Sequence, residues 1–174
     1  MQNIVDAYIE LCELLKNNLP TLKWIDLWHN QVNFLSEEHP FPTPAIFLSF
    51  RTLTTTDVGL HVQDADMQVD VYLFYETMAD TFKGSFNQES ALRFLEMINQ
   101  VHKLLHGYSG YNFSEMRSTG FAPVDTGGAG NLYRKSFVCL MRDYNANTTG
   151  EDGSEFTPQF NSAFGSDPDL LYNI

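Results

Sequence analysis

The first regular pattern along the chain is helical and covers residues 3–17. Apolar residues recur there at intervals of three and four, the spacing of one helix face. They are Ile4, Val5, Tyr8, Leu11, Cys12 and Leu15. Asp6, Glu10 and Glu13 lie off that stripe. Pro20 ends the pattern, because a proline disfavours helical geometry in the residue before it.

Three apolar segments then predict β-strands. LKWIDLWHN, at 22–30, is followed by the Pro-rich connection EEHPFPTP and by AIFLSF at 45–50. AIFLSF is short, apolar and bounded by breakers, as buried strands are. Residues 67–75 alternate strictly, which is the strongest strand signal in the chain. One side carries Met67, Val69, Val71, Leu73 and Tyr75, and the other carries Gln68, Asp70 and Tyr72.

A second helix is predicted from Asn87, a suitable N-cap, to Gly107, which suits a helix C-terminus. Its apolar stripe consists of Leu92, Leu95, Ile98, Val101 and Leu105. Two more strand candidates, residues 112–123 and 131–142, flank the Gly-rich segment DTGGAG. Such an arrangement is typical of a long hairpin.

This order of elements predicts an α+β fold, with a mostly antiparallel sheet of about four or five strands packed by two main helices, and a C-terminal extension. With 174 residues, 43% of them hydrophobic, the chain can bury the core of one domain. The residues that we expect to exclude water are Leu11, Leu15, Val69, Val71, Leu95, Ile98 and Val138.

The composition changes after Arg142, where acids occur without any Lys or Arg. The acids are Asp143, Glu151, Asp152, Glu155, Asp167 and Asp169. We therefore divide the chain into a domain, 1–145, and an acidic C-terminal arm, 146–174. The arm also carries apolar candidates for partner contact: Phe156, Phe160, Phe164, Leu170, Leu171 and Tyr172. Two interpretations stay open: the arm orders against a neighbouring subunit or partner, or it is disordered.

The charge balance limits the partners. Acids outnumber bases 22 to 10, a formal net charge of -12. Phosphate binding depends on Lys and Arg, so this balance argues against sequence-specific nucleic-acid binding and against an anionic membrane surface. The sequence also lacks a signal-peptide pattern and the roughly 20 apolar residues of a membrane span. We expect a protein that stays in the cytoplasm where it is made.

The candidates for reactive chemistry are weak. His102 and His106 have the four-residue spacing of paired metal ligands, but no glutamate of an HExxH motif and no third ligand accompany them. Asp64 and Asp66, before the alternating strand, are interpreted as turn and strand-edge residues. We interpret the histidines as polar residues on a helix surface and predict no metal site.

The DTGGAG segment and the two cysteines have equally plain interpretations. A DTG triplet occurs in aspartic proteases, but within a different, all-β pattern, and a phosphate-binding loop would need a following helix and a Lys. We interpret the segment as a hairpin turn. Cys12 and Cys139 have no CxxC spacing and are predicted to be free thiols. No catalytic residue and no cofactor is predicted, so we expect no enzyme.

Three stretches resemble the phage tail terminator or tail completion proteins, including their head-tail joining relatives. They are TPAIFLSF, then MQVDVYLFYE leading through a loop into SALRFLEMINQVHKLLHG, and finally NLYRKSFVCLMRDY. The resemblance covers residues 1–145 and lies in apolar patterns rather than signature residues. The acidic arm departs from the compact pattern of that family.

The resemblance implies a virion structural protein rather than an enzyme. Its subunits would close into a homo-oligomeric ring, a hexamer in that family, which caps the tail tube, ends tube polymerisation and joins the tail to the head connector. The implied partners are further copies of the chain, the tail tube protein and the neck proteins, with DNA passing through without sequence-specific contact. The implied location is the tail or neck of a virion assembled in a bacterial cytoplasm. Two alternatives stay open: another neck ring, such as a head-completion or adaptor protein, and a small α+β ligand-binding domain or enzyme.

Overall fold

The computed structural model describes residues 2–34, 41–76, 81–126, 130–144 and 146. Its elements follow the predicted order along the chain. They are α1 (Gln2–Asn18), β1 (Trp24–Leu27), the 3-10 turn η1 (Gln31–Phe34), β2 (Ala45–Gly59), β3 (Val62–Tyr75), α2 (Gln88–Ala91), α3 (Arg93–Leu105), β4 (Arg117–Val124) and β5 (Asn131–Asp143).

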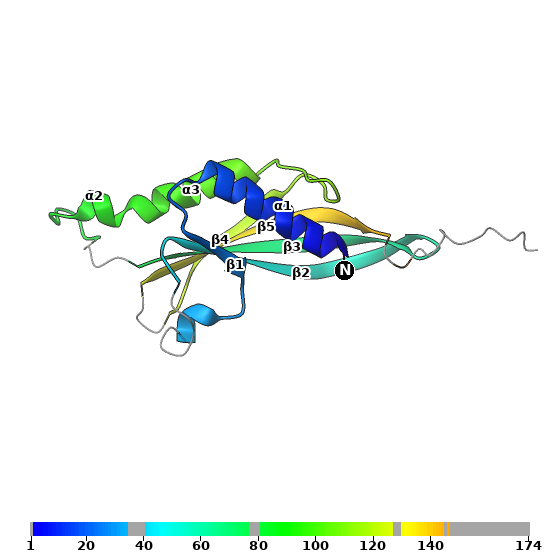
Figure 1. The fold of residues 1–174 in the computed structure, drawn as a ribbon, viewed down its shortest axis with the longest axis horizontal. Coiled ribbons are helices and arrows are strands. Elements are labelled where there is room, and N and C mark those ends of the chain that lie inside the picture. Colours follow the sequence, from blue (N-terminus) through cyan, green and yellow to red (C-terminus); the bar gives the residue numbers. More distant parts are fainter. Residues whose placement is uncertain (1, 35–40, 77–80, 127–129, 145, 147–174) are drawn as a thin grey trace, which may run out of the picture.

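The strands form one five-stranded mixed sheet in the order β1-β2-β3-β5-β4. β1 runs parallel to β2, and the other neighbouring strands are antiparallel. The two long helices, α1 and α3, lie over the same face of this sheet (Figure 1). The predicted α+β fold, with a mostly antiparallel sheet packed by two main helices, is therefore confirmed.

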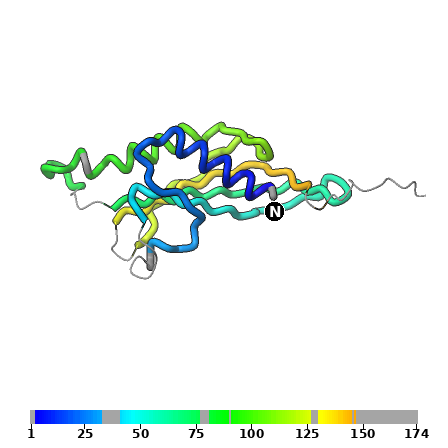
Figure 2. Tube along the Cα trace, in the orientation of Figure 1, coloured from blue at the N-terminus to red at the C-terminus, as the bar shows by residue number. Residues whose placement is uncertain are grey.

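The hairpin of β2 and β3 is longer than the sequence patterns indicated. β2 spans 15 residues and β3 spans 14. The added part of β2, RTLTTTDVG, is exposed along its whole length, so no alternation of apolar and polar residues marks it as a strand. Its threonines nevertheless favour extended backbone. The hairpin runs past the N-terminal end of α1 (Figure 2).

The main core lies between the sheet and the two helices. Leu11 and Leu15 of α1 pack there with Val69 and Val71 of β3 and with Phe137 of β5, all at most 2% exposed. Ile98 of α3 is also buried in this core. These positions confirm most of the residues that were expected to exclude water.

Two of those expectations were wrong. Leu95 is 37% exposed, because the buried face of α3 runs through Phe94, Met97 and Ile98 rather than through Leu95. Val138 is partly exposed, because Phe137 and Cys139 are the β5 residues that face the helices. The predicted single helix from Asn87 is also interrupted at Leu92, which separates α2 from α3.

A second, smaller core covers one end of the opposite face of the sheet. Phe47, Tyr72 and Phe74 are buried there together with Val32 of η1. The Trp28 ring stacks on the Tyr72 ring with 4.2 Å between centroids. Gln68, Asp70 and Tyr72 lie on the same face of β3, and the part of this face near Tyr72 is therefore buried in the second core.

Candidate functional site

The two helical histidines contact each other rather than a metal-type cluster. The rings of His102 and His106 stack with 5.0 Å between centroids. His106 Nδ1 accepts a hydrogen bond of 3.2 Å from the Ser118 backbone N–H. Burial lowers the pKa of His102, and the neighbouring charges of Lys135 and His106 lower it further. Within the described ranges, no group of three His, Cys, Asp or Glu side chains could hold a metal ion. His106 instead connects the end of α3 to Ser118 of β4.

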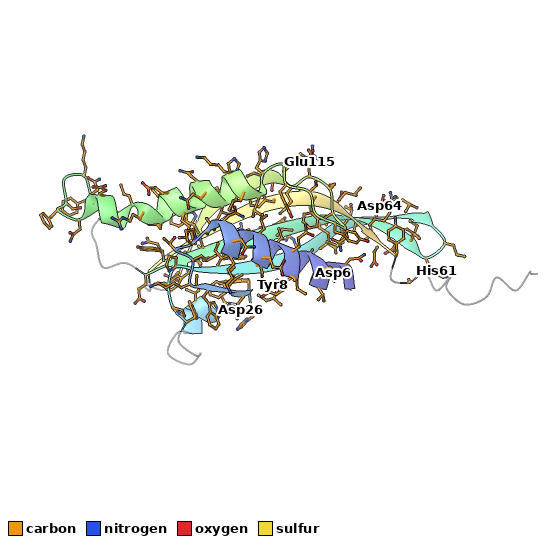
Figure 3. The ribbon with its side chains drawn as sticks, turned by 45° about the horizontal axis from the view of Figure 1, so that its top comes forward. Asp6, Tyr8, Asp26, His61, Asp64 and Glu115 are labelled. Carbon is orange, nitrogen blue, oxygen red and sulfur yellow. The ribbon has the colours of Figure 1, made fainter. Side chains whose placement is uncertain are left out.

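The two aspartates near the hairpin tie strands together. Both were interpreted as turn and strand-edge residues, and both lie inside β3, which begins at Val62, so the turn part of that interpretation was wrong. Asp64 accepts hydrogen bonds from Arg142 Nε at 2.6 Å and Nη2 at 2.8 Å, and these lower its pKa. Asp66 accepts a hydrogen bond of 2.8 Å from Thr54 Oγ1. Figure 3 labels Asp64 on this long hairpin.

Both cysteines are free thiols in the structure, as predicted. Cys139 is buried in the main core, and burial raises its pKa to about 11. Cys12 is half-buried on α1, and burial raises its pKa as well. The DTGGAG segment joins the antiparallel strands β4 and β5, as a hairpin connection should, although its residues 127–129 lie outside the described part.

Large apolar side chains remain exposed at several places on the described surface. Val5 and Ile9 of α1 and Trp24 and Leu27 of β1 are each between 40% and 49% exposed, and Ile9 and Trp24 line one pocket. The others are Leu53, Val58 and Leu60 on the hairpin, Phe82 and Phe86 before α2, Tyr111, Leu140 and Tyr144 near the end of β5, Leu95 on α3, and Phe121 on β4. A contiguous apolar patch would indicate a binding surface for another protein, whereas single exposed apolar side chains are ordinary.

A groove separates α1 from β1, with a volume of about 460 Å³. Its lining residues are Tyr8, Ile9, Cys12, Glu13, Lys16, Leu22, Lys23, Trp24 and Ile25. β1 is an edge strand of the sheet, and on its outer side the Leu27 N–H donates to Asp26 Oδ1 while the Leu27 carbonyl accepts from Gln31 Nε2, both at 2.8 Å. Edge strands are the part of a sheet most prone to pair with another chain, but the backbone groups of Leu27 are already bonded to the side chains of Asp26 and Gln31. We call this region the α1–β1 groove.

Charged and polar atoms border the α1–β1 groove. Burial raises the pKa of the Tyr8 phenol, and its hydrogen bond with Cys12 raises it further. Figure 3 shows Tyr8 on α1 and Asp26 on β1, the two elements that form the groove. Lys16 and Lys23 are exposed, and among the described residues neither forms an ion pair with a carboxylate. The groove thus combines an apolar interior with the charges of Lys16, Lys23 and Glu13, and the Asp26 carboxylate acts on its Tyr8 and Cys12.

A second open edge belongs to β2. β1 pairs with β2 only from Ala45 to Leu48, so residues 49–59 have β3 on one side and no strand of the described sheet on the other. Register shifts near Leu53 and Val58 bend this edge, and bulges of this kind restrict edge-to-edge pairing. The β2 edge is therefore longer than the β1 edge but less regular.

The partner-contact arm that the sequence indicated lies outside the described residues. This applies to Phe156, Phe160, Phe164, Leu170, Leu171 and Tyr172. The sequence analysis in turn missed the α1–β1 groove. Its only sequence signal was Ile9, which is apolar but lies off the predicted stripe of α1.

No protein-family model matches the chain, and comparison with curated proteins gives no match either. Among the described residues, no helix is both long enough and apolar enough to span a membrane. The fold and the exposed edges of the sheet are therefore the features from which a function can be inferred.

Proposed function

We propose that the chain is a structural virion subunit that assembles with copies of itself into a ring. Such a ring would cap a phage tail tube, end its polymerisation and join the tail to the neck. The observation that carries this proposal is the exposure of apolar side chains at both edges of one sheet. Trp24 and Leu27 lie on the β1 edge, and Phe121 lies on the β4 edge.

The position of these residues fits a ring better than a two-fold dimer. A rotational ring uses heterologous contacts, in which one surface of a subunit meets a different surface of the next. β1 and β4 are the two terminal strands of the sheet order, so they supply two different surfaces on opposite sides. The β1 side also carries the exposed helix residues Val5 and Ile9 of α1.

The finer parts of the proposal come from the family resemblance. The observed fold, with helices on a mostly antiparallel sheet, agrees with the fold that the resemblance implies. Six subunits, the tail tube and connector as partners, and a structural rather than an enzymatic role are the properties that the resemblance adds. Another ring of the neck stays the alternative, and the partner that it binds distinguishes it from a tail terminator.

Native mass spectrometry of the full chain and of two matched variants tests the ring. Ile9→Asp places a charge in the exposed apolar group on α1, whereas Leu95→Asp places the same charge on the exposed surface of α3. Both positions are solvent-exposed on helices, so both variants should keep the native circular dichroism spectrum. We expect Ile9→Asp to dissociate the ring and Leu95→Asp to leave it intact. A monomeric wild-type chain, or equal effects of the two variants, would contradict the proposal.

A pull-down with candidate partners separates a tail terminator from another neck ring. Assembled rings are mixed with purified tail tubes and, separately, with head connectors. A tail terminator should bind the end of tubes and stop their further growth. Rings that bind connectors and leave tube growth unchanged would identify a different neck component.

A further inference from the structure

The end of α3 and the loop after it cover the start of β4 on the side that faces away from β5. β4 is a terminal strand of the sheet, so β5 pairs with only one of its sides. Just before β4, the Met116 N–H donates to the Tyr108 carbonyl and the Met116 carbonyl accepts from the Gly107 N–H, both at 2.8 Å. Alternate residues of a strand direct their backbone groups to the same side, so the Ser118 N–H points to this covered side as well. There it donates to His106 Nδ1 at 3.2 Å.

The hydrogen bond from Ser118 requires an uncharged His106 ring. An uncharged imidazole has one nitrogen that accepts and one that carries a proton, whereas both nitrogens of the charged ring carry protons. Because Nδ1 of His106 is the acceptor, the proton of the uncharged ring lies on Nε2. Protonation would place a second donor opposite the Ser118 N–H, so the bond would be lost. Histidine is the side chain that ordinarily changes charge between about pH 5 and pH 8, and His106 is exposed to the solvent that supplies the proton.

His102 adds a second titratable ring to this contact. The two histidine rings stack with 5.0 Å between centroids. His102 Nδ1 is buried and has no hydrogen-bond partner among the described residues. Burial, Lys135 of β5 and His106 all lower the pKa of His102. The His102 ring therefore resists a charge, and a charge on either ring opposes a charge on the other. His106, which is exposed, is the ring that solvent reaches.

The other charged groups near this contact are mostly positive. Lys103 lies between the two histidines in the sequence of α3, and Arg117 directly precedes Ser118 on β4. Glu115, two residues before Arg117, is exposed. Among the described residues, neither histidine forms an ion pair with a carboxylate. A charged His106 would therefore lose its bond to Ser118 with no ion pair in this arrangement to replace it.

We propose that His106 is a proton-sensitive cover for the edge of β4, and that its protonation frees the Ser118 N–H and loosens this part of the strand. The register shift between Ser118 and Gly120 lies directly beside this bond. A bulge disrupts the ladder locally, so the His106 bond supports a part of β4 that β5 holds less regularly. Edge N–H groups that lose their cover are prone to pair with another chain, so acidification would open this edge. The device depends on the contact between α3 and β4 and does not require the proposed ring.

Hydrogen–deuterium exchange of the full chain tests this device. Mass spectrometry of overlapping peptides measures exchange of the Ser118 amide at about pH 8 and about pH 5, the limits of the range in which histidine ordinarily changes charge. The intrinsic rate at each pH is divided by the measured rate, which gives a protection factor. We expect the Ser118 amide to be roughly 2- to 10-fold less protected at the lower pH, the effect of one lost hydrogen bond.

Two substitutions at one position separate the hydrogen bond from the charge. His106→Asn keeps an acceptor, Oδ1, at the position of Nδ1, and this acceptor does not titrate. His106→Leu removes the acceptor. The asparagine variant should stay protected at both pH values, and the leucine variant should be poorly protected at both. His61→Asn is the matched control, because His61 is an exposed histidine between β2 and β3 and its φ of 59° suits asparagine. This control should keep the wild-type response to pH.

Three results would overturn the inference. Equal protection of the Ser118 amide at both pH values in the wild-type chain would show that acid does not release it. An equal loss of protection in His106→Asn would show that another titratable group, or a change of oligomeric state, causes the loss. Full protection in His106→Leu would show that the histidine does not hold the edge of β4.

Discussion

Replacing Leu105 with alanine tests the core between α3 and the sheet. The Leu105 side chain is 0% exposed and belongs to the main core. Truncating a fully buried leucine costs about 2–5 kcal/mol, which combines the lost transfer free energy with the cavity that remains. With a urea m-value of about 2 kcal/mol per molar, the unfolding midpoint should fall by roughly 1–2.5 M.

Leu95 provides the matched control on the same helix. It is 37% exposed and lies off the buried face of α3. Leu95→Ala should therefore change the free energy of unfolding by less than about 1 kcal/mol, because little packing is lost and alanine is a good helix former. Urea denaturation at one fixed protein concentration, followed by circular dichroism, measures both variants. A midpoint loss for Leu95→Ala as large as that for Leu105→Ala would refute the orientation of α3.

Three further predictions concern titration, thiol reactivity and the arm. The pKa of His102 is lower in the folded protein than in the unfolded chain, so the unfolded chain binds more protons below about pH 6.5. The free energy of unfolding therefore falls between about pH 7 and pH 5, and His102→Gln should make this fall smaller. An unchanged dependence of the unfolding free energy on pH in the variant would contradict this prediction. A thiol-reactive dye should leave Cys139 unmodified in the native protein and should label both cysteines after denaturation. A disulfide between the two cysteines would contradict this prediction. Ending the chain after Asn145 should leave the unfolding midpoint unchanged and weaken the ring. Truncated chains that assemble as well as full-length chains would show that the arm does not contribute to assembly.

The order of helices and strands could be predicted because local patterns determine it. The alternation from Met67 to Tyr75 and the stripe through Leu11 and Leu15 each correspond to one buried face. Gly107 ends α3 with a φ of 85°, a left-handed conformation that glycine adopts without strain. Its N–H donates to the Met116 carbonyl at 2.8 Å, so the residue predicted as a helix end has that role.

The remaining features depend on contacts that a local pattern does not contain. Leu95 and Phe94 are both apolar, and only the position of α3 over the sheet decides which of them is buried. Residues 51–59 form a strand because β3 pairs with them, although they bury no face. The α1–β1 groove brings Lys16 and Trp24 together from two elements, and their proximity follows from the packing of α1 beside the sheet edge.

Assembly of the chain with itself into a ring is the basis of the proposed function. Native mass spectrometry of the 19.9 kDa chain at low ionic strength measures this assembly. The proposal predicts one dominant closed oligomer, with six subunits as the number that the resemblance implies, and its loss in the Ile9→Asp variant. A chain that remains monomeric at micromolar concentration, alone and in the presence of tail tubes, would contradict it.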